Sequence, residues 1–172
     1  MNTQSVPRDQ EANRRKLCEL IKDIDFCMLT TVDDSGNLHS RPMSTSGEVD
    51  DDGALWLFTT VSSLKVKETE RTPKVNVSFA APSRQRYVSV TGTAQLVRDQ
   101  AKMRELWKPE LKAWFQNGLE DPNVALLKIN ATQAEYWDSY PSSVSQVIGL
   151  VKSMFTGEPP KVGEHESVTL GR

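Results

Sequence analysis

The stretch from Leu55 to Glu70, LWLFTTVSSLKVKETE, predicts a strand that runs directly into a short helix. Its first four residues are apolar and include two aromatic side chains, which is typical of a buried strand. Hydroxyl residues follow, and Ser62 or Ser63 is suited to cap a helix that begins at Leu64. This junction gathers hydroxyls, free backbone N–H groups and the positive end of a helix dipole beside Lys65, which together make a phosphate site. The alternative is a plain capped helix with Lys65 in solvent.

Short segments rich in strand-forming residues, separated by turn signals, occupy much of the remaining chain. The expected strands are Phe26–Val32, Leu38–Ser46, Ala54–Thr60, Lys74–Ala81, Gln85–Val97, Val124–Ile129 and Ala134–Trp137. Gly92, in the middle of the longest of these segments, predicts a bulge or bend. Six or seven strands in hairpin order, with helices only at the periphery, predict a mainly β fold and an antiparallel barrel.

The expected helices lie outside this series of strands. They are Asp9–Asp25, the Ser62–Glu70 helix, Asp99–Phe115, which Pro109 breaks into two pieces, and Ser143–Phe155. Trp107 and Trp114, in the third of these segments, are expected to be core anchors. The length of the chain fits one domain, so we expect a single domain over residues 1–156 and an extended or mobile tail over residues 157–172.

The composition argues against several classes of protein. A net charge of −2 without a basic run gives no sign of a nucleic-acid partner. The longest apolar runs stop after four or five residues, far short of the roughly 20 that a membrane helix needs. The polar N-terminal residues lack the apolar core of a signal peptide, so a cytoplasmic protein is expected. Cys18 and Cys27 are then expected to be reduced thiols, and no metal site is predicted.

The common catalytic and nucleotide-binding motifs do not occur either. The sequence contains neither G-x-G-x-x-G nor G-x-x-x-x-G-K-[ST], and its acidic turns are typical of solvated loops. What remains is a set of anion-binding groups: Arg41 in the second strand, Thr59 and Thr60 at the end of the third, and Ser63 and Lys65 in the helix that follows. Because consecutive strands of a meander are neighbours, we expect Arg41 near Thr59, so that three segments converge on one phosphate.

The order of these features resembles the flavin-binding split barrels of the pyridoxamine 5'-phosphate oxidase type, and more closely the general stress protein 26-like branch. The resemblance spans about residues 15–145 and rests on the segments FCMLTTV, HSRPM, LWLFTT with SSLK, KVNVSFA, YVSVTGTA and EYWDSYPSS. It implies a six-stranded antiparallel split barrel, a homodimer, and flavin mononucleotide (FMN) bound at the interface between subunits.

The resemblance also implies roles for individual residues. Arg41 and Lys65 would neutralise the phosphate, and Thr59 and Ser63 would donate hydrogen bonds to it. Pro42 and Met43 would line the flavin ring with their backbone, Tyr87 would lie near the ring, and Trp137 would pack against the cofactor. Phe58 and Thr60 complete the expected cofactor-binding residues. All of the recognised groups address the first phosphate, so the dinucleotide FAD stays open as an alternative cofactor.

Two departures from the vitamin B6 oxidases argue against pyridoxamine 5'-phosphate oxidase activity. Those enzymes carry an Arg next to the phosphate-site Lys, and this chain has Leu64 there. They also carry Arg and His soon after the late Trp to hold the substrate, and this chain continues with Asp138, Ser139, Tyr140 and Pro141. The sequence therefore predicts a flavin site without the B6 substrate site.

The leading hypothesis is a flavin-dependent oxidoreductase of unknown substrate, in which the cofactor supplies the chemistry, because no side chain stands out as an acid or base. The alternative is a non-catalytic flavin carrier or a redox or stress sensor. A third reading is an interaction module whose cofactor pocket has degenerated. Haem is a weak option, since His39 is the one candidate ligand in the barrel portion of the sequence.

Overall fold

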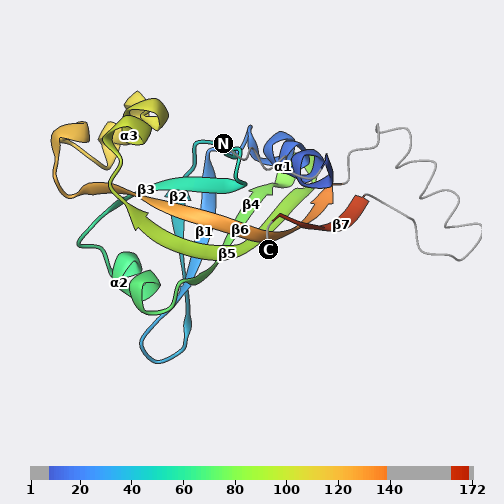
Figure 1. Cartoon of the computed structure of the whole chain (residues 1–172), viewed down its shortest axis with the longest axis horizontal. Helices are drawn as coiled ribbons and strands as arrows, with labels where there is room; N and C mark the ends of the chain where they lie inside the picture. The colour runs from blue at the N-terminus through green and yellow to red at the C-terminus, as the bar shows by residue number, and fades with distance from the viewer. Residues whose placement is uncertain (1–7, 139–163, 171–172) are drawn as a thin grey trace, which may run out of the picture.

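One antiparallel sheet curls into a barrel, with its helices at the periphery (Figure 1). The computed structural model describes residues 8–138 and 164–170. Six strands follow one another in the order β2-β1-β4-β5-β6-β3, and β7 pairs with β6. The strands are β1 (Phe26–Val32), β2 (Leu38–Ser44), β3 (Ala54–Thr60), β4 (Lys74–Ala81), β5 (Arg86–Val97), β6 (Val124–Asp138) and β7 (Glu164–Thr169). This is the six-stranded split barrel that the sequence predicts, with one further strand beside it.

The barrel is split because the two strands at the ends of the sheet order, β2 and β3, meet at a single point. They are joined by one isolated bridge between Thr45 and Leu57, whereas β3 pairs along its length with β6. The expectation that β2 and β3 pair as meander neighbours is therefore wrong. The chain between them is too long for a tight turn, and it buries Val49 in the core as it crosses the barrel end.

A bulge opposite Gly92 allows the longest strands to bend, as the sequence predicts. The register between β5 and β6 shifts between Thr91 and Gly92. A Cβ atom at Gly92 would lie 2.3 Å from the backbone oxygen of Asn130, so only glycine fits at this close approach. The expected sixth and seventh strands, Val124–Ile129 and Ala134–Trp137, are a single strand, β6. The polar residues between them interrupt the apolar pattern, but their backbone stays paired with β5 across the bulge.

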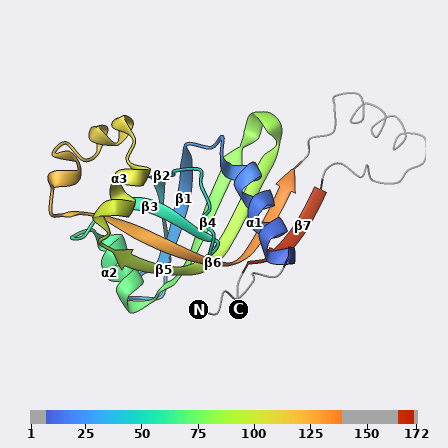
Figure 2. The same ribbon diagram turned by 45° about the horizontal axis from the view of Figure 1, so that its top comes forward.

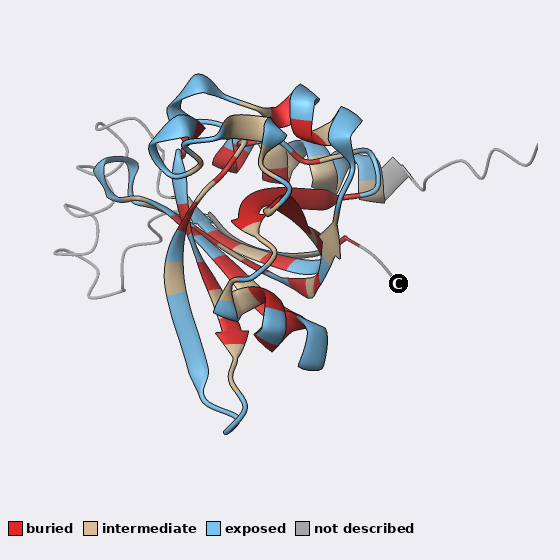
Figure 3. Cartoon of the chain, turned by 90° about the vertical axis from the view of Figure 1, so that its left-hand side faces the viewer, coloured by how far each residue is buried: buried red, intermediate tan, exposed pale blue. Residues whose placement is uncertain are grey.

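Two apolar cores lie on opposite sides of the sheet. The larger core fills the barrel, and helix α1 (Arg8–Ile21) adds Leu17, Leu20 and Ile21 to it (Figure 2). The smaller core lies outside β3 and β6, where helix α3 (Gln100–Leu106) packs Met103 and Leu106 against the sheet. Buried residues recur along the other strands, whereas most of β2 and the turn before it are exposed (Figure 3).

Most of the expected helices are present, with changed ends. Helix α1 ends at Ile21 instead of Asp25, and α2 spans Leu64–Arg71. The expected Asp99–Phe115 segment divides near Pro109 into α3 and a 3₁₀ helix, η2 (Pro109–Ala113), because proline cannot continue an α-helix. The expected helix at Ser143–Phe155 lies outside the described residues.

The described part of the expected extended or mobile tail is extended. Residues Glu164–Thr169 form β7 and pair with β6 from Gln133 to Asp138. Leu170 follows the strand, and its buried side chain joins the barrel core. The sequence pattern did not indicate this strand because the segment has few apolar residues. Backbone pairing, the core side chain of Leu170 and the partly buried Val168 hold it in place.

Candidate functional site

A cleft of about 310 Å³ lies where the barrel is split. From the bridge at Thr45 and Leu57, the edges of β2 and β3 diverge and form its two walls. The lining residues are Phe26 of β1, Pro42, Met43 and Ser44 of β2, Phe58, Thr59 and Thr60 of β3, Lys65 of α2, and Leu111, Trp114 and Phe115 of the segment that includes η2. The cleft therefore brings together six of the predicted site residues, which come from three separate segments.

Hydroxyl groups and Lys65 gather where β3 meets α2. The hydroxyl oxygens of Thr59 and Ser63 lie 3.2 Å apart. Ser63 occupies the N-cap position of α2, as expected, but its side chain does not cap the helix. The first backbone N–H groups of the helix are therefore left available, and the helix dipole makes this end positive. These groups suit an anion.

Lys65 is a half-buried cation in this corner of the cleft. Burial lowers the pKa of Lys65, and the nearby charge of Arg41 lowers it further, while Glu68 opposes this effect. A lowered lysine pKa means that the ammonium group is less stable here than in water. An anion bound beside Lys65 would restore the lost stabilisation.

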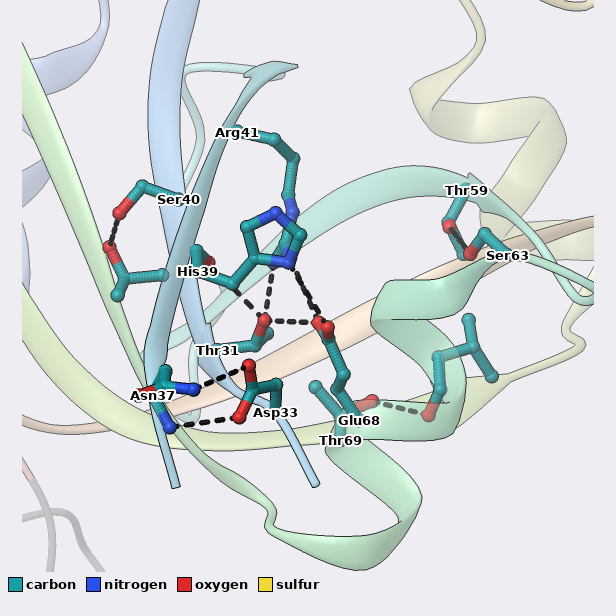
Figure 4. A network of polar contacts seen from close by, with 12 residues as sticks. Thr31, Asp33, Asn37, His39, Ser40, Arg41, Thr59, Ser63, Glu68 and Thr69 are labelled. Carbon is teal, nitrogen blue, oxygen red and sulfur yellow. Dashed lines mark hydrogen bonds and ion pairs between the residues drawn. The ribbon is translucent and has the colours of Figure 1, made fainter. Parts of the chain in front are cut away.

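Arg41 is not among the residues that line the cleft, and its guanidinium is bonded to groups on β1 and α2 (Figure 4). Its Nη1 donates to the Thr31 hydroxyl at 2.5 Å, and its Nη2 donates to Glu68 Oε2 at 2.8 Å. No contact joins Arg41 to Thr59 in the described chain, so the expected neighbourhood of these two residues is not seen. The positive charge of Arg41 nevertheless lowers the pKa of Lys65 in the cleft.

Thr31, His39 and Glu68 are site-associated residues that sequence reasoning missed. Glu68 is 2% exposed, and its two oxygens face Arg41, Thr31 and His39. The sequence around it alternates charges of both signs, which is typical of a solvated helix face. Position 68 lies one turn after Lys65, and that spacing alone could have linked the two residues.

Aromatic side chains form the outer part of the cleft, and most of them were also missed. The rings of Phe26 and Trp114 contact edge to face at 6.0 Å between centroids. Phe58 packs in the same way against Trp107, at 5.4 Å. Trp107 is thus a core anchor, as expected, but Trp114 is 59% exposed and lines the cleft. An apolar, aromatic surface of this kind suits a planar ring.

Tyr87 and Trp137 lie elsewhere in this chain. They are register partners on β5 and β6, and both side chains are exposed on the outer face of the sheet. Neither residue lines the cleft. Within one chain, the structure therefore does not unite them with the other predicted site residues.

Two further features of the described residues concern possible metal ligands and the Cys27 thiol. No group of three or more His, Cys, Asp and Glu side chains there could hold a metal ion. Burial raises the pKa of the Cys27 thiol to about 12, and the thiol donates to the Met43 carbonyl. In residues 8–138 and 164–170, no helix is both long enough and apolar enough to span a bilayer.

The fold and the cleft define a split-barrel protein with an anion-binding corner and an aromatic wall. A family model described as pyridoxamine 5'-phosphate oxidase like matches residues 12–161. The chain therefore belongs to the pyridoxamine 5'-phosphate oxidase-like family. Protein bli-3 of Neurospora crassa is 30% identical over 173 aligned residues, which cover 95% of this chain and 82% of that protein.

Solved structures of general stress proteins share the fold. A general stress protein 26 from Jannaschia sp. CCS1 superposes with a TM-score of 0.75 at 25% identity, covering 92% of this chain and 99% of that one. The general stress protein 26 of Bacillus anthracis gives a TM-score of 0.64 at 28% identity, over 72% of this chain and 92% of its own. The general stress FMN/FAD binding protein of Xanthomonas citri gives 0.62 at 27% identity, over 77% and 92%.

Proposed function

We propose that this chain binds FMN in the cleft at the split of the barrel and is a flavin-dependent oxidoreductase. The observation that carries the proposal is the presence of a half-buried Lys65 and an aromatic wall in one cleft. A phosphate fits the first feature and a flavin ring fits the second. The similarity to the Xanthomonas citri FMN/FAD binding protein supports the same cofactor class.

The residues of the cleft divide between the two ends of such a ligand. Lys65 and Thr59 would hold the phosphate, together with Ser63 and the N-terminus of α2, which lie beside the cleft lining. Pro42, Met43 and the aromatic side chains would face the ring. The bound flavin would supply hydride transfer, and the chain would bind and orient it and exclude water from one side.

The lining of the cleft offers little for acid–base catalysis. Among the described residues that line the cleft, Lys65 is the one ionisable side chain, and the proposal assigns this residue to the phosphate. A lining without another acid or base favours a reaction in which the flavin supplies the chemistry. The same lining equally suits the second candidate function, a flavin carrier or redox sensor without turnover. Steady-state assays with a reduced nicotinamide and a panel of acceptors would separate the two.

We infer a homodimer from the outer face of the sheet. Met28 pairs in register with Pro42, and Tyr87 pairs with Trp137, and both pairs lie on the same face of the sheet, with β4 between them. Met28, Tyr87 and Trp137 are 41%, 45% and 40% exposed, which is high for large apolar residues on a sheet. In such a dimer, Tyr87 and Trp137 of one copy reach the cleft of the other.

The test of flavin binding is a titration of the purified protein, freed of any bound flavin, with FMN and then FAD. We expect saturable quenching of flavin fluorescence at one flavin per chain. Lys65→Ala should weaken FMN binding about 10-fold or more, because a charge-assisted hydrogen bond contributes roughly 1.5 to 3 kcal/mol. Lys67→Ala is the matched control, since Lys67 is exposed on the same helix and does not line the cleft.

Riboflavin, which lacks the phosphate, should bind the native protein and Lys65→Ala alike. Absence of binding by the native protein would refute the proposed cofactor and favour an interaction module. Equal weakening by Lys65→Ala and Lys67→Ala would show that the phosphate does not lie beside Lys65.

A further inference from the structure

Glu68 is a buried carboxylate surrounded by donors from two strands (Figure 4). The Thr31 hydroxyl on β1 donates to its Oε2 at 2.5 Å, and Arg41 on β2 donates to the same oxygen. His39 Nδ1, also on β2, lies 3.2 Å from Oε1. The Arg41 guanidinium also donates to Thr31, so Arg41, Thr31 and Glu68 close a triangle of hydrogen bonds.

This triangle fixes the position of Arg41. A free arginine side chain has several flexible bonds, and its ordering opposes ligand binding. Here two of its five N–H groups are held by Thr31 and Glu68, and the remaining ones are still able to donate. Pro42, the residue after Arg41, lines the cleft, as does Lys65, which lies one turn before Glu68 on α2. The charge of Arg41 also lowers the pKa of Lys65.

We propose that Glu68 is a positioning residue for a phosphate group in the cleft: it acts through Arg41, whose guanidinium it holds in place. This inference rests on the proposed function and names a residue that the ligand does not touch. Thr31 is a second positioning residue, because its uncharged hydroxyl accepts a hydrogen bond from Arg41 and donates one to Glu68.

Two effects of Glu68 on a phosphate have opposite signs, which makes the inference testable. As a plain negative charge, Glu68 would repel the phosphate, and Glu68→Gln would tighten binding. As a positioning residue, it makes Arg41 effective, and Glu68→Gln would weaken binding. We expect a loss of FMN affinity of about fivefold or more, with riboflavin affinity unchanged because riboflavin carries no phosphate.

The experiment is a double-mutant cycle on FMN affinity, read by flavin fluorescence in the full chain. Glu68→Gln should weaken FMN binding in the native background and cause no further loss in an Arg41→Ala background. Glu70→Gln is the matched control, since Glu70 is exposed on the same helix and should leave affinity unchanged. Circular dichroism and thermal unfolding report whether each variant is folded.

Thr31→Val covers the case in which Glu68→Gln does not fold. It keeps both charges and the side-chain shape and removes the bridging hydroxyl, so it should also weaken FMN binding and spare riboflavin. Unchanged or tighter FMN binding in the folded variants, or full loss again in the Arg41→Ala background, would overturn the inference. Failure of the native protein to bind FMN would remove the proposed function as well, and the first titration reports this separately.

Discussion

At the scale of the residue, Glu68 differs most from what its sequence neighbours suggest. Lys67, Glu70 and Arg71 on the same helix are exposed, whereas Glu68 is buried against two strands. Burial raises the pKa of Glu68, but hydrogen bonds from Thr31 and His39 and the charge of Arg41 outweigh it, so the pKa lies below its ordinary value. The carboxylate therefore stays charged at neutral pH and helps to hold α2 on the barrel.

The free energy of unfolding should depend on the protonation of Glu68. A carboxyl group whose pKa is lower in the folded chain stabilises the fold above its unfolded pKa, about 4.3 for glutamate, and this stabilisation is lost as the pH falls through the folded value. In urea unfolding between pH 3 and 7, the native protein should lose stability below about pH 4.3 more steeply than Glu68→Gln. Parallel pH profiles for the two proteins would contradict this.

The candidate site could be predicted from sequence where its residues follow a strand end, and not where they depend on pairing across the fold. Thr59 and Lys65 are close in sequence, and the strand-to-helix junction brings them to one cleft. Arg41 was expected at the phosphate, and no local sequence signal indicates its contact with a buried carboxylate 27 residues later in the sequence. Trp114 enters the cleft only because η2 folds back over the barrel.

At the scale of the element, the strands with regular alternation were predictable and their partners were not. The limits of β1, β3 and β4 agree with the sequence pattern because each has a clear apolar face bounded by turn residues. The continuity of β6 was hidden, since its polar middle is held by backbone bonds to β5. Partners depend on the whole sheet: β6 pairs with β5 on one edge and with β3 and then β7 on the other.

The strand β7 should contribute to stability through Leu170. Its backbone N–H donates to the Thr132 carbonyl at 2.9 Å, and its side chain lies in the barrel core. Leu170→Ala should lower the free energy of unfolding by about 2 to 4 kcal/mol, as other large-to-small core changes do. Ser167→Ala, at an exposed position of β7, serves as control in the same urea titration. A change in Leu170→Ala no larger than the control would mean that β7 is not part of the folding unit.

At the scale of the whole molecule, the exposed apolar residues on the outer face of the sheet form the contact of the proposed homodimer. Trp137→Arg places a charge in the centre of the proposed contact, next to Tyr87, and should convert a dimer to a monomer because an unpaired buried charge is costly. Light scattering after gel filtration gives the mass directly. Gln116→Arg, at an exposed position outside the sheet, is the matched control and should leave the mass unchanged. A native monomer would contradict the inferred homodimer.

The single bridge between Thr45 and Leu57 leaves the two edges of the barrel weakly joined. A ligand that spans these edges binds the folded chain and not the unfolded one, so it adds to stability by mass action, about 2.7 kcal/mol when its free concentration is 100 times its Kd. A change of this size alters the fraction of chains exposed to proteases several-fold or more. The abundance of this protein in a cell would then follow the supply of its ligand, even at a constant rate of synthesis.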